Sequence, residues 1–135
     1  MYLVDTNIWL ERLLLAQAKS DEVRDFLDRV PLSELFITDF AFHSLCVVLT
    51  RLKKETAPLK FVEDVFVDGA VTLVSVPPEE TQSLIDAMSK FNLDFDDAYQ
   101  YVAAEKQGLV IVSFDGDFNR TARGKKTPAE ILEST

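Results

Sequence analysis

The sequence of 135 residues predicts an α/β fold with a mostly parallel central sheet, organised as one domain over residues 1–135. Short apolar segments suited to buried strands recur along the chain, and stretches with helical periodicity separate them. Capping residues also stand where several of the helices should begin. Strands that alternate with helices form parallel sheets, because each helix returns the chain to the same edge of the sheet. The length gives room for four strands and about six helices.

Four short segments have the composition of buried strands. They cover residues 2–4, 35–37, 71–76 and 109–112. Each is rich in branched or aromatic apolar residues and is too short for an amphipathic helix. The last segment, Leu-Val-Ile-Val, is the clearest buried strand in the chain.

Helices are expected in the intervals between these strands. The first should begin at Asn7, directly after the first strand, and the second should be capped by Ser20 or Asp21. Thr38 and Asp39 are placed to cap a long third helix, because they stand between the second strand and a periodic apolar stretch.

The second half of the chain continues this alternation. Pro58 is expected to open a helix, and the Pro77-Pro78 pair should end the third strand and start the next helix. Asp94 begins a further helix that Gly108 closes. Residues 127–130, Thr-Pro-Ala-Glu, are typical of a capping box at the start of a short terminal helix.

Composition limits the classes of function. The net charge is −9, with 23 acidic and 14 basic side chains, which argues against general attraction to nucleic acid unless metal ions neutralise a carboxylate cluster. A single cysteine excludes an intrachain disulfide and fits a reducing compartment. No apolar run approaches the roughly 18 residues of a membrane helix, and the N-terminus lacks the positive region of a signal peptide. We therefore expect a cytoplasmic protein without membrane contact.

Acidic residues follow two of the predicted strands and begin one of the helices. Asp5 comes directly after the first strand, and Asp115 comes shortly after the last. Asp94, Asp96 and Asp97 lie in the first turn of the helix that precedes this last strand. Functional sites of parallel sheets lie beyond the carboxyl ends of the strands. Three separate segments are therefore expected to bring carboxylates to one edge of the sheet.

A divalent cation would make such a carboxylate cluster tolerable. Like charges repel one another, and burying them away from water adds a further cost. Hard oxygen ligands suit Mg²⁺ or Mn²⁺, which activates bound water and offsets the negative charge of a phosphodiester transition state. The chain contains no GxSxG, no CxxC and no pair of histidines that would supply another nucleophile or metal site.

Each acidic segment also has a purely structural interpretation. Acids in the first turn of a helix cap free N–H groups and interact favourably with the helix dipole. Asp94 fits this role, and Asp97 is left for function because a cap is already available. Asp96 fits equally well an exposed helix face or a supporting position behind the metal ligands. Residues 5–7 and 115–117 can each be ordinary polar turns. The functional interpretation depends on the three segments together.

In their order and spacing these segments resemble the PIN-domain family of metal-dependent nucleases, which includes the VapC-type toxin ribonucleases. Residues 2–8, Tyr-Leu-Val-Asp-Thr-Asn-Ile, are similar to the family's opening strand and first catalytic Asp. Residues 96–104 are similar to its Asp-Ala pair at a helix start, and residues 108–118 to its strand that runs into Asp and then Asp-Phe. The resemblance spans nearly the whole chain. It implies a three-layer α/β/α sandwich with a short, mostly parallel sheet of four to five strands.

The resemblance also implies roles for individual residues. Asp5, Asp97 and Asp115 match metal-binding carboxylates of the family. Asp117 matches a further ligand or a residue that orients a metal-bound water. Ser113 matches a hydroxyl position close to the metals. All four acids are expected to be catalytic, with Mg²⁺ or Mn²⁺ as the cofactor.

Other positions are expected to support this cluster, and one departs from the family pattern. Asn7 matches a position that braces the acids, and Asp96 lies beside one of them. The family usually carries a Glu on the helix after the second strand, where this chain has Ser44 beside His43. His43, the only histidine, is expected either to ligate Mn²⁺ or contact a phosphate, or to pack within the helix.

A basic segment follows the last acids and suggests where RNA would lie. It contains four cations within seven residues, namely Arg120, Arg123, Lys125 and Lys126. A phosphate backbone could follow these cations towards the metal ions, and the alternative is an ordinary solvated loop. Single-stranded RNA is the substrate class that the family resemblance implies.

Aromatic and leucine-rich positions suggest further contacts. Aromatic residues near the predicted site either stack on bases or belong to the core; they are Phe95, Tyr99, Phe114 and Phe118. Leucines at 13, 14 and 15 suit a homodimer face, a groove for the helix of an antitoxin, or plain core packing.

Three functions follow from these patterns. The leading hypothesis is a Mg²⁺- or Mn²⁺-dependent endoribonuclease, acting as the toxin of a VapBC-type toxin–antitoxin pair. The alternative is a catalytically degenerate PIN-like module for RNA binding or regulation, because the usual Glu is missing. A phosphoryl-transfer or signalling domain of flavodoxin-like shape ranks last, because it would require a Lys at a strand end near the acids, and the last strand ends in Ser-Phe-Asp.

Overall fold

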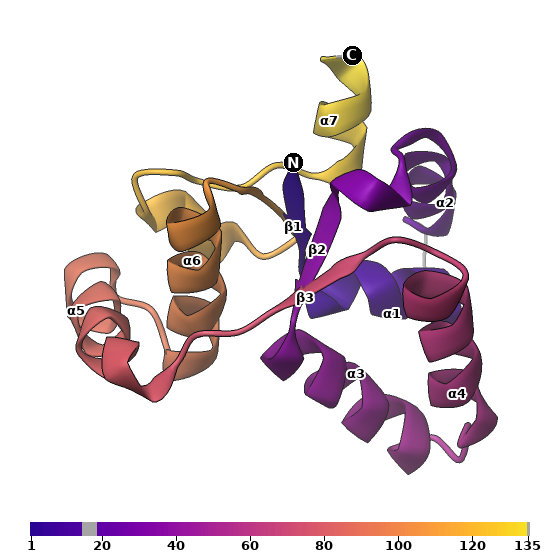
Figure 1. Ribbon diagram of the computed structural model, residues 1–135. Coiled ribbons are helices and arrows are strands. Elements are labelled where there is room, and N and C mark those ends of the chain that lie inside the picture. Colours follow the sequence, from indigo (N-terminus) through magenta and orange to yellow (C-terminus); the bar gives the residue numbers. More distant parts are fainter. Residues whose placement is uncertain (15–18, 135) are drawn as a thin grey trace.

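The computed structural model describes residues 1–14 and 19–134 and contains a four-stranded parallel sheet (Figure 1). The strand order is β3-β2-β1-β4, and every pairing is parallel. The strands are β1 (Tyr2–Val4), β2 (Leu35–Thr38), β3 (Thr72–Val74) and β4 (Val110–Val112). The prediction of an α/β fold with a short parallel sheet is confirmed. The first and last strands of the chain pair with each other, with β4 at the edge of the sheet, Tyr2 opposite Val110 and Val4 opposite Val112.

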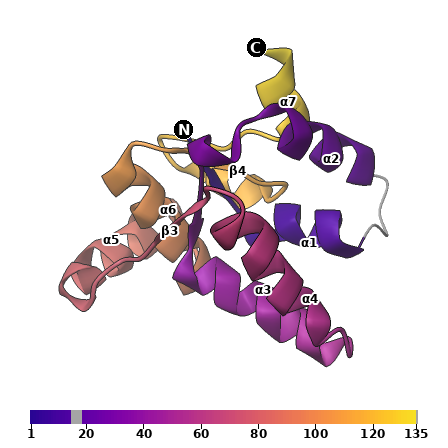
Figure 2. The same ribbon diagram turned by 45° about the vertical axis from the view of Figure 1, so that its right-hand side comes forward.

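Helices cover both faces of this sheet (Figures 1 and 2). Within the described ranges they are α1 (Thr6–Leu14), α2 (Ser20–Arg29), α3 (Asp39–Arg51), α4 (Thr56–Val62), α5 (Thr81–Phe91), α6 (Phe95–Gln107) and α7 (Pro128–Glu133). Helices α5 and α6 lie on one side, and α1, α2, α3, α4 and α7 lie on the other. The predicted three-layer sandwich is therefore also confirmed. None of the described helices is long and apolar enough to cross a membrane.

Strands β1 and β4 are apolar along their whole length because helices cover both faces of the sheet. In β1, Leu3 packs into the core beneath α5 and α6, whereas Val4 packs into the core beneath the other helices. Adjacent residues of β4 divide in the same way, with Ile111 on the first face and Val112 on the second. Successive side chains of a strand point to opposite faces, so a strand covered on both sides needs apolar residues at every position.

Several predicted helix ends are confirmed by side-chain caps. Thr38 accepts a hydrogen bond from the Ala41 amide at the start of α3, and Asp94 accepts one from the Asp97 amide at the start of α6. Gly108 ends α6 in the left-handed conformation, at φ 67°. Thr127 and Glu130 form both hydrogen bonds of a capping box.

Other predicted boundaries were wrong in detail. Ser20 does not cap α2; it is the first residue of that helix, and its hydroxyl donates to Glu11. Helix α4 begins at Thr56, so Pro58 lies inside its first turn, where the missing N–H is tolerated. The strand expected over residues 71–76 is limited to β3. The prediction for Leu15 falls outside the described residues.

Candidate metal centre

Acidic side chains from three segments meet at the carboxyl edge of the sheet. Asp5 follows β1 directly, Asp97 lies in the first turn of α6, and Asp115 and Asp117 flank the start of a short 3₁₀ turn after β4. Asp97, Asp115 and Asp117 each offer an oxygen, and these three oxygens lie within 4.8 Å of one another. The parallel sheet produces this arrangement, because the ends of β1 and β4 are neighbours at the same edge.

Asp5 is held in a fixed position by three hydrogen-bond donors. Its Oδ1 accepts from Gln100 Nε2 at 2.9 Å and from the Thr6 amide at 2.8 Å. Its Oδ2 accepts from Ser113 Oγ at 2.7 Å. Burial raises the pKa of Asp5; the three hydrogen bonds oppose this shift, and the charge of Asp115 adds to it. Asp5 is not one of the three residues whose oxygens converge. Its negative charge nevertheless contributes to the raised pKa of Asp97.

Ser113 and Asn7 connect the ends of β1 and β4. The Ser113 hydroxyl donates to Asp5 and accepts from Asn7 Nδ2 at 3.3 Å and from the Asp115 amide at 2.9 Å. Asn7 Oδ1 also accepts from the Phe114 amide at 3.4 Å. The Ser113 hydroxyl thus uses its one donor and both of its acceptor positions. The structure places both residues beside Asp5.

Gln100 is a site residue that sequence reasoning missed. Its side chain is buried in α6, where Nε2 donates to Asp5 and Oε1 accepts from Thr38 Oγ1 at 2.6 Å. Thr38 is also the cap of α3. One buried amide therefore joins the end of β1 to the start of α3. The available signal was a lone amide one helical turn after Asp97, on a helix whose inner face is otherwise apolar.

Asp97 lies in a much less favourable environment than Asp5. Burial, followed by the negative charges of Asp115, Asp94, Asp5 and Asp117 in that order of importance, raises the pKa of Asp97 to about 7. Among the described residues no donor forms a hydrogen bond to the Asp97 carboxylate. The group therefore lacks a compensating positive partner at neutral pH.

The donor set fits a divalent cation of the hard class. Mg²⁺ is usually held by a few carboxylates together with water and substrate phosphate, and three convergent carboxylate oxygens meet that requirement. A cation there would also remove the repulsion that raises the pKa of Asp97. Asp97, Asp115 and Asp117 are the residues that would hold it, with Asp5 bordering the site.

Asp117 is the most exposed of the convergent acids, and it already has a cationic neighbour. It forms an ion pair with Arg120, which also donates to the backbone carbonyl of Asn92. Arg120, which is one of the residues expected to contact RNA, therefore lies at the rim of the acid cluster.

The remaining basic residues are not all at this rim. Arg123 donates to the Leu109 carbonyl at 3.3 Å, at the amino end of β4 and hence away from the acids. The backbone of Lys126 lies beside β4 and forms hydrogen bonds with the backbone of Ile111 and Ser113. The Lys126 side chain is exposed. The structure therefore does not gather the four predicted cations in one patch.

His43 and Asp96 lie beside the acid cluster, outside the trio of convergent oxygens. Both line a shallow pocket between the starts of α3 and α6. Ser44 is half-buried on α3, so this helix brings no carboxylate at the position where the family usually carries a Glu.

The predicted aromatic contacts divide between surface and core. Phe95 is 45% exposed at the start of α6, and Tyr99 is half-buried next to the same pocket as His43. Phe118 is fully buried and belongs to the core. Phe114 is half-buried and packs against the core beneath α1, α2, α3, α4 and α7, with the Lys19 ammonium 4.3 Å above its ring.

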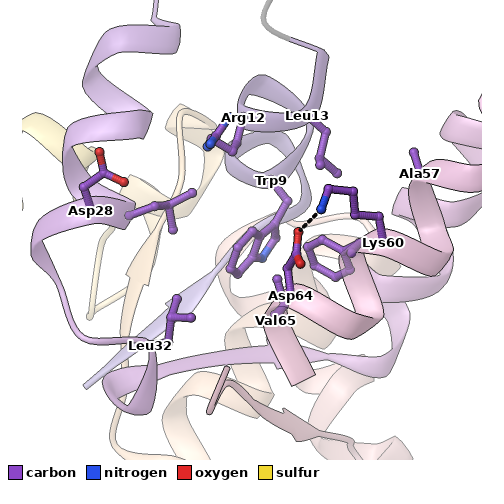
Figure 3. Close-up of a pocket in the computed structure, with 11 residues that line it drawn as sticks. Trp9, Arg12, Leu13, Asp28, Leu32, Ala57, Lys60, Asp64 and Val65 are labelled. Atoms are coloured by element: carbon purple, nitrogen blue, oxygen red, sulfur yellow. Dashed lines mark ion pairs between the residues drawn. The ribbon is translucent and has the colours of Figure 1, made fainter. Parts of the chain in front are cut away.

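A second cleft lies on the opposite side of the sheet from α6, between α1, α2 and α4 (Figure 3). Its volume is about 460 Å³. Apolar side chains such as Trp9 and Leu13 form much of its wall, and an ion pair between Lys60 and Asp64 crosses its edge at 3.2 Å. The Trp9 indole is buried, and its Nε1 has no hydrogen-bond partner within the described part of the chain.

Comparison with known proteins gives a family match and several structural matches. The family model of the PIN domain matches residues 2–124. No curated protein matches the chain.

Several solved structures share the fold. The VapC20 toxin of Mycobacterium tuberculosis, described as cleaving the sarcin-ricin loop, is 17% identical with a TM-score of 0.80, and the match covers 95% of this chain and 100% of that one. A toxin–antitoxin complex from Klebsiella pneumoniae is 16% identical with a TM-score of 0.74, over 95% and 98% of the two chains. FitAcB from Neisseria gonorrhoeae is 18% identical with a TM-score of 0.75, over 96% and 99%. At these identities the likeness is one of fold.

Proposed function

The chain belongs to the PIN-domain family, and from this premise we propose that it is a Mg²⁺- or Mn²⁺-dependent endoribonuclease that hydrolyses phosphodiester bonds in single-stranded RNA. The observation that carries the proposal is the convergence of oxygens from Asp97, Asp115 and Asp117 beside the half-buried Asp5. Such a cluster is electrostatically costly without a cation, as the raised pKa of Asp97 indicates. An RNA substrate also agrees with a cytoplasmic location.

The proposed mechanism divides the work among the acids. Asp97, Asp115 and Asp117 would hold the cation, and a bound cation would supply an activated water and offset the charge that develops on the phosphate. Asp5, fixed by Gln100 and Ser113, presents a carboxylate of defined orientation at the border of that site. In this position Asp5 can accept a hydrogen bond from the attacking water and so orient it towards the phosphorus atom.

A cleavage assay tests this proposal. The purified protein should cut single-stranded RNA in Mn²⁺, and the activity should disappear with EDTA and in Asp97→Asn. Asp68→Asn is the matched control, because Asp68 is an exposed acid on the loop before β3. Equal cleavage by wild type, Asp97→Asn and Asp68→Asn would refute the site and point to a contaminating nuclease.

A degenerate binding module is the second candidate, and the serine at position 44 is the observation that favours it. Without a carboxylate at position 44 of α3, the site has one acid fewer than the family pattern. Titration calorimetry with Mn²⁺ separates the two functions. Heat of binding that is lost in Asp97→Asn supports the nuclease, whereas no binding at millimolar Mn²⁺ supports the module.

We also propose a protein antitoxin as partner, with its helix in the cleft between α1, α2 and α4 (Figure 3). The cleft has apolar walls, which suit the apolar face of an amphipathic helix. A structural neighbour is itself a toxin–antitoxin complex. Trp9 is the only tryptophan, so its fluorescence should shift when the product of a neighbouring gene binds. Self-association into a homodimer stays a prediction, to be checked by light scattering.

A further inference from the structure

A shallow aromatic pocket lies beside the acid cluster and has no part in the proposed mechanism. It has a volume of about 330 Å³ and is lined by Asp39, Phe40, His43, Phe95, Asp96 and Tyr99. Asp39 is the chain neighbour of Thr38, and Asp96 is the chain neighbour of Asp97. The pocket thus lies at the starts of α3 and α6, and the first turn of α6 also carries Asp97 of the proposed metal site.

Aromatic rings form the walls of this pocket, and one of them is held rigidly. The Tyr99 hydroxyl accepts from the Val76 amide at 2.9 Å and donates to Asp39 Oδ1 at 2.8 Å. The Phe40 and Tyr99 ring centroids are 6.0 Å apart, with their planes at 55°. Phe95 leaves 45% of its surface in water. An exposed ring beside a fixed one provides a surface on which a flat, apolar group can stack.

The charges of the pocket select the kind of flat group that fits. Asp96 makes no hydrogen bond or ion pair in the part of the chain that the structure describes. Asp39 Oδ1 accepts from Tyr99 and from the Phe40 amide, which leaves its other oxygen available. Two carboxylates repel a phosphate group but accept hydrogen bonds from N–H donors. The complementary ligand is therefore an aromatic ring whose edge carries N–H groups.

Among nucleobases, guanine satisfies this requirement best. Its imino and amino N–H groups are adjacent, so both can bond to the two oxygens of one carboxylate, whereas adenine and cytosine present one amino group each. Uracil presents a single N–H between two carbonyl oxygens, which the carboxylates repel. Bonds between N–H donors and an ionised carboxylate are also the stronger kind.

We propose that this pocket binds a base of the RNA next to the cleaved bond and prefers guanine to uracil. The inference rests on the proposed function in one respect, namely that the substrate is RNA. Phe95 stacks on the base, and Asp96 accepts hydrogen bonds from its edge. The pocket thereby gives the enzyme a base preference that the metal site alone cannot provide, because phosphates carry no sequence information.

Titration with nucleotides, followed by NMR, tests the pocket directly. His43 is the only histidine in the chain and lines the pocket, so its ring signals are a single, readily assigned reporter. Guanosine 5′-monophosphate should shift these signals in the presence of Mg²⁺, and uridine 5′-monophosphate should bind about tenfold more weakly. Ribose 5-phosphate, which lacks a base, should leave them unmoved.

Two variants and two matched controls complete the experiment. Phe95→Ala should weaken guanosine monophosphate binding about tenfold, as expected for a lost stacking contact. Asp96→Asn should remove most of the preference for guanine. Ile85→Ala, which alters a residue of equal 45% exposure on α5, and Asp68→Asn should change neither. Dispersed backbone amide signals in the spectrum of each variant show that it is folded.

The outcomes separate this inference from the proposed nuclease function. If guanosine and uridine monophosphates shift His43 equally, or if Phe95→Ala binds as well as wild type, the base pocket is refuted even in a protein that cuts RNA. If guanosine monophosphate binds as expected but no RNA is cleaved with any divalent metal, the pocket stands and the nuclease proposal fails.

Discussion

Asp5 and Asp97 are both partly buried acids at the same edge of the sheet, yet the protein treats them differently. Asp5, at the end of β1, receives hydrogen bonds from Gln100, Ser113 and the Thr6 amide. Asp97, on the first turn of α6, faces other acids and receives none among the described residues. The fold itself therefore fixes one carboxylate, and it leaves the other to be stabilised from outside.

This difference indicates which part of the site is held by the fold and which part depends on a bound cation. A hydrogen-bonded carboxylate keeps its position whether or not a cation is present. A carboxylate surrounded by like charges gains most when a cation arrives. Asp5 is thus held in place by the fold alone. The repulsion around Asp97, in contrast, is what a bound metal ion would relieve.

Substituting the two acids gives the largest expected effects and tests the contrast directly. Asp5→Asn and Asp97→Asn should each lower metal-dependent cleavage by at least about 100-fold, the upper end of the loss when a mere supporting group is removed. Urea unfolding of the metal-free protein at pH 8 should give a higher free energy of unfolding for Asp97→Asn than for Asp5→Asn. The former relieves repulsion, whereas the latter points an amide N–H at a Ser113 oxygen that already accepts two bonds.

Equal stability changes in the two variants would break the comparison, because the two carboxylates would then be energetically equivalent. Asp86→Asn on α5 is a control for the general effect of removing one negative charge. It should leave cleavage unchanged.

The second prediction concerns pH and metal. Burial and neighbouring acids raise the pKa of Asp97 from 3.8 to about 7, so the folded protein keeps a proton there to higher pH than the unfolded chain. Stability of the metal-free protein should therefore fall as pH rises between these two values, and this contribution should level off above about pH 7. Mg²⁺ at about 100 times its Kd should raise the Tm by roughly 10 °C at pH 8.

At pH 5 the same Mg²⁺ concentration should have little effect, because a protonated Asp97 binds metal poorly. Differential scanning fluorimetry at both pH values gives the four required Tm values. If Mg²⁺ raises the Tm as much at pH 5 as at pH 8, the ionised Asp97 carboxylate is not what makes the protein bind the cation.

The third prediction sharpens the contrast from the side of Asp5. Gln100→Leu keeps the volume of the side chain but removes the donor to Asp5 and the acceptor for Thr38. It should lower stability by about 1–3 kcal/mol and weaken Mn²⁺ binding by about 10- to 100-fold. Gln82→Leu is the matched control, because the Gln82 amide bonds to Asp86 on the exposed face of α5.

Calorimetric Mn²⁺ titration of the folded variant distinguishes two roles for Gln100. Reduced stability together with weaker Mn²⁺ binding means that Gln100 positions Asp5 for the metal. Reduced stability with unchanged Mn²⁺ affinity means that Gln100 only fills the core.

The sequence predicts one side of the Asp5–Asp97 contrast better than the other. Asp5, Asp97 and Asp115 can be placed from local patterns, because strand ends and helix starts are read from apolar runs and caps. The layers and the parallel sheet follow from the same patterns. The convergence of the acids at one edge then follows from the way parallel strands pack.

The support beneath Asp5 could not be predicted in this way. Gln100 and Thr38 are 62 residues apart, and their hydrogen bond exists only because β2 brings α3 next to α6. Arg123 shows the same limit, since its neighbours in sequence indicate RNA contact while the fold directs it to the Leu109 carbonyl. Local patterns indicate which residues carry charge, and the tertiary fold decides which partner that charge meets.

The smallest expected effects concern the basic residues that follow the acid cluster. They show the same contrast between a group that the fold holds in place and groups that stay available for a ligand. Arg123 is fixed on a backbone carbonyl, whereas Lys125 and Lys126 form no ion pair at contact distance within the described ranges. If the lysines serve RNA, Lys126→Ala should lower the salt dependence of single-stranded RNA binding by about 0.7 in the log–log slope, the contribution of one phosphate contact. Arg123→Ala should instead lower the Tm and leave that slope unchanged. Fluorescence anisotropy across a salt series measures the slope, and a change in Arg123→Ala without one in Lys126→Ala would reverse the assignment of the two cations.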